Sequence, residues 1–221
     1  MRSSMSDNFD SLLTLEQREI LSALTTPFKI QSFLDTVPYS PEERDRCPLE
    51  VLQDRLAHCL DGGLFAAMAL RRIGFPPLIV DLFPDAGMDD DHILAIFKHK
   101  GCFGAVAKSN FTGLRYREPV FLSLRELVMS YFEQFYNVDG VLTLRTYTVP
   151  LNLSSYDRWN WMADGSMIPT IADRLTRRRQ FRVISPEASA ELNPVDPLLY
   201  QAGMMVANPA GLYKPKINPI I

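Results

Sequence analysis

Residues 58–74 read HCLDGGLFAAMALRRIG, and this stretch decides the fold that we expect. Its apolar run from Leu64 to Ile73 is typical of a helix, and Gly74 closes it. The stretch therefore places Cys59 at a helix start, where unpaired backbone N–H groups and the helix dipole favour negative charge. The same setting lowers the pKa of a cysteine and makes its thiol nucleophilic.

A histidine stands at the start of a later segment. His92 opens an apolar, strand-like run that extends to Phe97. A cysteine on a helix start and a histidine on a strand could form a nucleophile–base pair. His58 is a poorer base for Cys59, because adjacent helical residues point about 100° apart. His99 lies between two lysines, and we expect it to be solvated.

Length and composition indicate an ordinary globular chain. The 221 residues are 47 % hydrophobic and 22 % charged, which suits one domain over residues 1–221 with its core at about 45–150. The net charge of −3 argues against nucleic acid or an anionic membrane as the main partner.

The location of the protein is predicted from what the sequence does not contain. No window approaches the roughly 18 apolar residues that a membrane span needs. Residues 1–10 lack the apolar stretch that a secretory signal contains. The three cysteines, Cys47, Cys59 and Cys102, are too few and too irregular for a disulfide framework, so we expect a reducing cytoplasm.

The order of expected elements predicts an α+β fold. Helices come first, then a meander of strands, then more helices. Hydrophobic spacing predicts helices over 10–24, 30–37, 49–56, 64–73, 122–136, 167–177 and 188–192. It predicts strands over 77–83, 92–97, 102–107 and 142–149, and a Pro-rich tail over 208–221. Ser123 and Glu126 form a capping-box pattern at the start of the helix over 122–136.

These residues carry a family likeness. Cys59, an acidic residue two positions later, an apolar helix and LRRIGFP over 70–76 resemble the nucleophile helix of the transglutaminase-like cysteine enzyme superfamily. In that family a strand follows the helix, a histidine opens the next strand as His92 does, and an aromatic such as Phe103 opens the one after. The segment KSNFTGLRYREP over 108–119 resembles an extended form found in bacterial members.

The resemblance implies a papain-like α+β core, with the nucleophile helix packed on a small antiparallel sheet and flanked by further helices. It also implies a Cys-His-Asp triad, from which this chain departs. The stretch after Phe103 has no acid, so Asn110, or else Ser109, would orient His92. An amide fixes the tautomer of the histidine but adds no charge to stabilise an imidazolium.

Other residues near these motifs are candidates for substrate binding. Asp61 and Gly62 leave room for the backbone to face a substrate, and backbone N–H groups at this turn could form an oxyanion hole. Arg115 and Arg117 could bind a carboxylate or phosphate. An ion pair with Glu118, or simple surface charge, explains the two arginines more economically.

The function that we expect is a thiol-dependent hydrolase or acyltransferase. Cys59 would attack an amide of a peptide, a protein or a small molecule to form a thioester, which water or an amine would resolve. We expect no cofactor and no metal. The acidic run 89–91 with His92 could hold a cation, but a solvated turn is favoured. The alternative is a catalytically degenerate member that binds a peptide or protein in the former active-site cleft.

Overall fold

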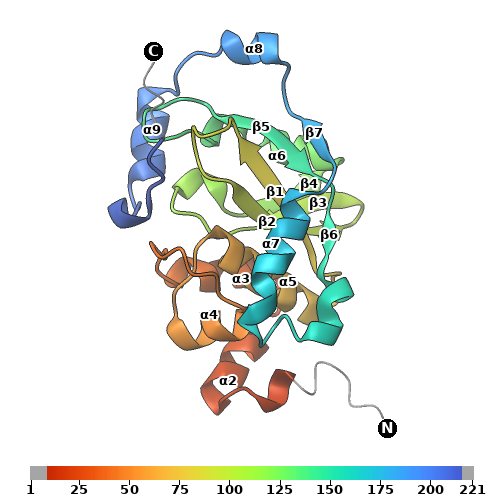
Figure 1. Cartoon of the computed structure of the whole chain (residues 1–221). Helices are drawn as coiled ribbons and strands as arrows, with labels where there is room; N and C mark the ends of the chain where they lie inside the picture. Colours follow the sequence, from red (N-terminus) through yellow and green to blue (C-terminus); the bar gives the residue numbers. More distant parts are fainter. Residues whose placement is uncertain (1–8, 216–221) are drawn as a thin grey trace.

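A seven-stranded antiparallel sheet forms the centre of the structure (Figure 1). The computed structural model describes residues 9–215; residues 1–8 and 216–221, which belong to the N-terminal segment and the Pro-rich tail considered above, lie outside the described part. The strands run in the order β4-β3-β2-β1-β5-β7, and β6 pairs with β1. Their bounds are β1 Leu78–Pro84, β2 His92–His99, β3 Cys102–Val106, β4 Arg117–Phe121, β5 Leu144–Thr148, β6 Leu151–Asn152 and β7 Gln180–Arg182.

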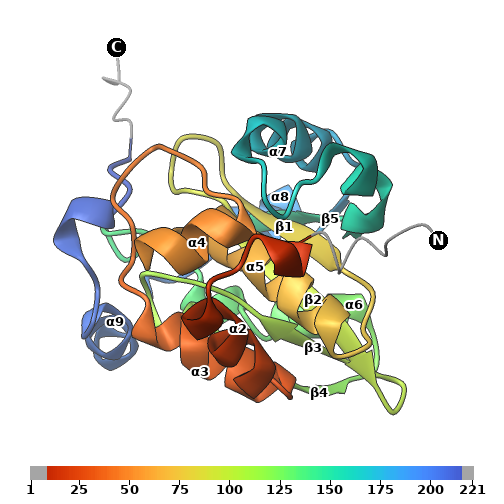
Figure 2. The same cartoon turned by 90° about the horizontal axis from the view of Figure 1, so that it is seen from below.

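Helices cover both faces of this sheet. Figure 2 shows the N-terminal helices in front of the strands, with α6 behind them. The α-helices are α2 Leu15–Ala23, α3 Pro27–Thr36, α4 Pro48–Asp54, α5 Cys59–Arg72, α6 Leu124–Met129, α7 Ile168–Thr176, α8 Pro186–Ala190 and α9 Pro197–Met204. Short 3₁₀ turns occupy 112–114, 132–134, 153–159, 165–167 and 209–211. The structure therefore confirms the α+β class with an antiparallel sheet, while the description of the chain as a single domain stays a prediction.

The side chains of the sheet alternate between two cores. Ile79, Ile93 and Ala95 point toward helix α5, and we call this side the α5 face. Val80 and Leu94 point to the opposite side, where they pack with α6; we call this the α6 face. The register pairs residues that share a face, such as Ile79 with Ala95 and Val80 with Leu94.

Helix α5 lies very close to the sheet. A Cβ atom on Gly62 would fall 2.1 Å from Cβ of Lys108, and one on Gly63 would fall 2.5 Å from Cγ2 of Ile93. Both glycines are buried, so their missing side chains make room for the strands beneath. Gly62 therefore has a packing role, whereas the sequence suggested a substrate contact.

The helix predicted over 122–136 is shorter than expected. It ends after Met129, because Arg117 binds both the carbonyl and the hydroxyl oxygen of Ser130, at 3.0 Å each. Ser123 caps the start as predicted, but the Glu126 carboxylate accepts from the Leu122 backbone N–H rather than from Ser123. The capping-box prediction is thus half right.

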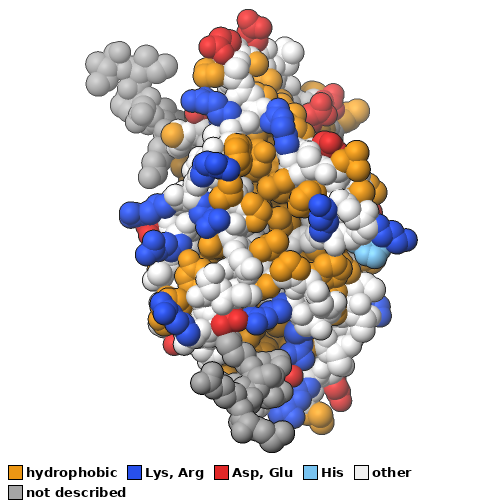
Figure 3. Space-filling model, turned by 90° about the vertical axis from the view of Figure 1, so that its right-hand side faces the viewer, with side chains coloured by type: hydrophobic (Ala, Val, Ile, Leu, Met, Phe, Trp, Pro, Cys, Tyr) orange, Lys and Arg blue, Asp and Glu red, His pale blue; other side chains and the backbone are white. Residues whose placement is uncertain are grey.

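None of the described helices combines the length and apolarity needed to cross a bilayer. Figure 3 shows one side of the molecule on which hydrophobic side chains gather at the centre, with Lys and Arg scattered around them.

Candidate functional site

The first turn of α5 is built as the sequence predicts. The helix begins at Cys59, and His58 is its N-cap. The ring Nδ1 of His58 accepts from the Leu60 backbone N–H at 3.2 Å. The Asp61 carboxylate accepts from the His58 backbone N–H at 3.1 Å, which completes a reciprocal cap. The predicted helix start is therefore confirmed, with an imidazole as the capping acceptor.

The thiol of Cys59 is in a different electrostatic setting from the one expected. Its side chain is buried, and Sγ lies 3.7 Å from the backbone carbonyl oxygen of Asp91, to which it donates. Burial raises the pKa of Cys59 well above its usual value, and the charges of Asp91, Asp90 and Asp81 raise it further. Burial and the nearby carboxylates therefore oppose the thiolate that the helix N-terminus was expected to favour.

His92 faces away from this thiol. It pairs in register with Leu82, so its ring belongs to the α6 face. There the ring lies edge-on to Tyr131 and Phe135, and Nε2 donates to the Leu114 carbonyl at 2.8 Å. The structure does not bring His92 to Cys59, because alternation along β2 sends the ring to the far side of the sheet.

The environment of His92 keeps its ring neutral. Burial lowers its pKa to about 4, partly offset by the hydrogen bond to Leu114, while Arg117 lowers it further. A neutral imidazole on this side of the sheet acts as a buried donor to a loop carbonyl. This is a structural role, whereas the sequence suggested a general base.

The two candidates for orienting His92 bind other groups. Ser109 and Asn110 share a small cavity of about 40 Å³ with His92. The Ser109 hydroxyl accepts from the Phe111 backbone N–H at 3.0 Å. Asn110 makes a reciprocal pair with the Asn208 backbone: Nδ2 donates to its carbonyl at 2.9 Å, and Oδ1 accepts from its N–H at 2.7 Å. Neither side chain therefore orients the imidazole.

The predicted arginines hold loops together. Arg117 stacks over the Tyr131 ring, 4.0 Å from its centroid, and donates to the Gly113 carbonyl at 2.8 Å. Arg115 pairs with Asp35 at 3.3 Å. Neither arginine pairs with Glu118, which instead accepts from the Tyr116 hydroxyl. These contacts place both guanidinium groups in structural roles.

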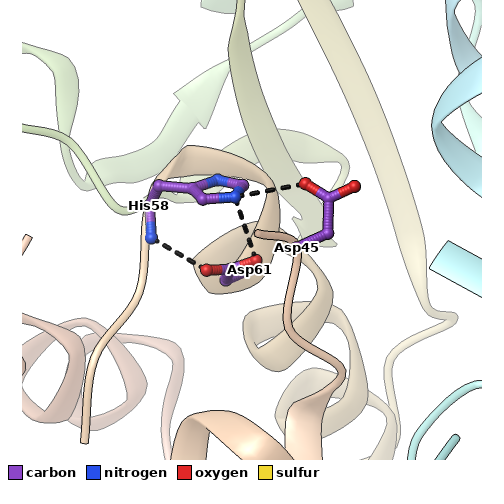
Figure 4. A group of neighbouring side chains, drawn as sticks. All are labelled: Asp45, His58 and Asp61. Atoms are coloured by element: carbon purple, nitrogen blue, oxygen red, sulfur yellow. Dashed lines mark hydrogen bonds and ion pairs between the residues drawn. The ribbon is translucent and has the colours of Figure 1, made fainter. Parts of the chain in front are cut away.

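Asp61 anchors a small polar cluster above α5. Figure 4 shows the His58 ring lying between Asp45 and Asp61, and its Nε2 is 3.2 and 3.3 Å from their oxygens. Burial opposes charge on His58, but the hydrogen bond to Asp45 and the charge of Asp61 raise its pKa. Asp61 also accepts from the Arg46 backbone N–H at 2.7 Å. Burial outweighs these donors and raises the pKa of Asp61 to about 6.

The same three side chains have the geometry of a metal ligand set, which the sequence did not suggest. Their ligand atoms lie within 4.8 Å of one another. The two oxygens of Asp61 already accept from two backbone N–H groups and the His58 ring, and the Arg46 guanidinium is 3.8 Å away. Hydrogen bonding alone therefore accounts for this cluster.

An acidic cleft opens beside Cys59. Its volume is about 430 Å³. The lining is Tyr39, Ser40, Pro41, Glu42, Glu43, Asp45, His58, Cys59, Leu60, Asp90, Asp91, Ala172, Ala210, Gly211, Leu212 and Tyr213. Five of these described lining residues are acidic and none is Lys or Arg. The acidic run at 89–91, predicted as a solvated turn, thus contributes two carboxylates to a cleft wall.

Two of the carboxylates at this site are poorly compensated. Burial raises the pKa of Asp91 to about 6, and the charge of Asp90 adds to this effect. Burial, together with the charges of Asp91 and Asp90, raises the pKa of Asp81 to about 9. Asp81 is 1 % exposed, and its Oδ1 has no hydrogen-bond partner among the described residues. The α5 face therefore concentrates negative charge at this end of the sheet.

Tyr39 lies between the cleft and the thiol. Burial and the charges of Cys59 and Asp90 raise its pKa well above the usual value, while an interaction with the Cys59 backbone N–H lowers it. That N–H, expected in an oxyanion hole, thus faces a phenol. Sequence reasoning missed Tyr39, Asp45 and Asp81; the one available signal was the density of acids on both sides of the strand over 77–83.

Comparisons with known proteins give distant fold-level likeness. No family model and no curated protein matches the chain. Among solved structures, Legionella pneumophila LapG is similar with a TM-score of 0.39 and 13 % identity, covering 72 % of this chain and 93 % of that one. An EGTA-treated form of LapG gives a TM-score of 0.39 and 12 % identity over the same shares.

Proposed function

We propose that the protein is a binding module whose cleft accepts a cationic group, an ammonium or guanidinium, presented by a peptide or protein. One observation carries the proposal: carboxylates converge on the cleft beside Cys59, and no described lining residue is Lys or Arg. Burial raises the pKa of Asp91 and the charge of Asp90 adds to this effect, so a cation placed there would favour the ionised carboxylate.

The dimensions and the aromatic lining suit a side chain of this kind. A cleft of about 430 Å³ is within the usual range of ligand sites. Tyr39 and Tyr213 lie in its wall, and aromatic rings attract Lys and Arg side chains. His92 lies on the opposite face, and His58, the histidine in the cleft lining, pairs with Asp45 and Asp61. These features favour the binding reading over nucleophilic catalysis.

Calorimetry with short peptides tests the proposal. A pentapeptide with a central lysine should bind, and its acetyl-lysine counterpart should bind at least about tenfold more weakly, because acetylation removes the charge. Asp91→Asn should weaken lysine-peptide binding about tenfold. Glu133→Gln removes an exposed acid outside the cleft lining and should leave binding unchanged. Equal binding of the two peptides would exclude recognition of the cation.

Binding should also depend on pH in a defined direction. Protonation of Asp91 removes negative charge from the cleft, and its pKa is about 6. We therefore expect lysine-peptide affinity to rise from pH 5 to pH 7.5 and to change less in Asp91→Asn. A flat profile in the wild type would show that this carboxylate does not contact the ligand charge.

A thiol hydrolase or acyltransferase is the second candidate. The observation in its favour is Cys59 at the first residue of a 14-residue helix and in the cleft wall. Iodoacetamide labelling at pH 6 separates the two functions. The enzyme requires Cys59 to react faster than Cys47 and Cys102, and His92→Ala to abolish that advantage. The binding module requires no advantage for Cys59.

A further inference from the structure

The C-terminal segment crosses the cleft. Figure 2 shows the chain after α9 running beside the loop that leads into α4. Four consecutive residues of this segment, 210–213, line the cleft together with Cys59 and the acidic side chains. Gly211 rests on the Tyr39 ring so closely that an added Cβ would be 2.9 Å from a ring carbon. The segment thus forms one wall of the cleft.

A single residue fastens this segment to the body of the protein. Asn208 exchanges two backbone hydrogen bonds with the buried Asn110 amide, and its own Nδ2 donates to the Tyr39 carbonyl at 3.1 Å. Before this point, α9 is held independently, since the Thr112 hydroxyl donates to the Ala202 carbonyl and the Tyr136 hydroxyl to the Leu199 carbonyl. Asn208 is therefore the last polar anchor before the cleft.

Beyond that anchor the described hydrogen bonds stay local. Ala210 and Gly211 donate their backbone N–H groups to Asn208 itself, at 3.1 and 3.0 Å. The contacts of residues 209–215 with the cleft are packing contacts, such as Gly211 against Tyr39. A segment held in this way can leave the cleft without breaking the secondary structure of the rest of the protein.

The segment also matches the cleft in charge. Lys214 is exposed and directly follows Tyr213, the last residue of the lining. The opposite walls contribute Glu42, Glu43 and Asp90. Lys214 therefore places a cation of the chain itself next to a cleft whose described lining has no Lys or Arg.

We propose that residues 208–215 form a strap that closes one side of the cleft beside Cys59, and that the cleft opens further when the Asn110–Asn208 pair separates. This proposal rests on the proposed function for the nature of the ligand. An incoming cationic peptide then enters a cleft with one movable wall. Ligand affinity is set partly by the stability of the anchor.

The reaction rate of Cys59 with a neutral disulfide reagent reports whether the strap is open. Peptide mass spectrometry separates its labelling from that of Cys47, the fully buried N-cap residue of α4, which reports global unfolding in the same sample. Asn110→Ala removes both bonds to Asn208, and we expect Cys59 to label about tenfold faster with Cys47 unchanged. Asn152→Ala removes an asparagine cap at the opposite end of β1 and should change neither rate.

A second variant keeps the test decisive if Asn110→Ala also exposes Cys47. The double variant Leu212→Ala, Tyr213→Ala keeps the Asn110–Asn208 hydrogen bonds but removes two large side chains from the strap. Cys59 should therefore again label faster than in the wild type. Wild-type rates for Cys59 in the folded variants would overturn the strap. If the strap proposal is right but the proposed ligand is wrong, Cys59 labels faster in the variants and the lysine pentapeptide does not protect it. If only the strap is wrong, the peptide protects Cys59 equally in the wild type and the variants.

Discussion

Asp91 and His92 are neighbours at the start of β2, yet they serve opposite faces of the sheet. Asp91 lines the acidic cleft and its backbone carbonyl accepts from Cys59. His92 lies between aromatic rings on the α6 face and donates to the Leu114 carbonyl. One end of the sheet thus has a charged side and a neutral side. The comparison teaches that a shift of one residue along the strand decides whether Asp91 or His92 lies on the same side of the sheet as Cys59.

The two faces should respond to acid in opposite directions. On the α5 face, Asp61 and Asp91 have pKa values raised to about 6, so their protonation favours the folded state as pH falls through that range. On the α6 face, the pKa of His92 is lowered to about 4 from 6.5. Its neutral form stabilises the fold above pH 6.5, and that contribution is lost as pH falls toward 4.

The largest expected effect breaks the close packing on the α5 face. Gly62→Ala places a methyl group 2.1 Å from Cβ of Lys108, which forces α5 away from the sheet. We expect a loss of about 3 kcal/mol in the free energy of unfolding, measured with urea. Better helix propensity offsets about 1 kcal/mol of the strain. An unchanged midpoint would mean that α5 does not lie so close to β3.

The next effect isolates the α6 face. His92→Gln keeps a donor for the Leu114 carbonyl but cannot titrate. The wild type should lose about 3 kcal/mol relative to this variant between pH 6.5 and pH 4, as the shift of the His92 pKa requires. Chemical denaturation at several pH values measures the difference. Parallel curves for the two proteins would place His92 in solvent.

A stabilising change should follow on the α5 face. Asp81→Asn removes a buried acid whose pKa is raised to about 9 by burial and by Asp91 and Asp90. Because a raised pKa disfavours the folded state once the acid ionises, the variant should be more stable at pH 8 by about 1–2 kcal/mol. Thermal melts at pH 6 and pH 8 should show a larger gain at the higher pH. Glu133→Gln, an exposed acid, is the control.

The smallest effect probes the aromatic wall around His92. The Tyr131 hydroxyl donates to the Arg115 carbonyl at 2.7 Å. Tyr131→Phe keeps the ring beside His92 and should cost about 1 kcal/mol of stability. The pKa of His92, followed by NMR titration, should stay low, because burial by the ring is retained. A return of that pKa to its ordinary value would show that the hydroxyl, and not burial, controls it.

Sequence reasoning predicted the local elements at this site better than their directions. The start of α5 at Cys59 and the strand at His92 follow from hydrophobic spacing and are confirmed. The run from His92 to Phe97 is buried on both sides, so no polar alternation marks which residues face α5. The sequence of a continuously apolar strand does not show which side chains point to which side of the sheet. The predicted Cys59–His92 pair depended on that information.

The remaining failures arise from partners far away in the chain. Asn110 was expected to orient a histidine, but its amide binds Asn208, 98 residues later. The exposed strand β7, Gln180–Arg182, pairs with β5 without any hydrophobic signal of its own. Asp81 looked like part of a buried strand, and the rise of its pKa depends on burial and on Asp91 and Asp90, which only the fold places beside it. These are properties of the assembled fold and have no local pattern.

The glycine contact between α5 and the sheet has a consequence for exchange kinetics. With Gly62 and Gly63 pressed against Lys108 and Ile93, helix α5 and strand β2 share one tightly packed block. Their amide protons should exchange with deuterium only on global unfolding, while those after Asn208 exchange through local opening. Cys59 would then sit at the boundary between the slowest and the fastest exchanging parts of the chain.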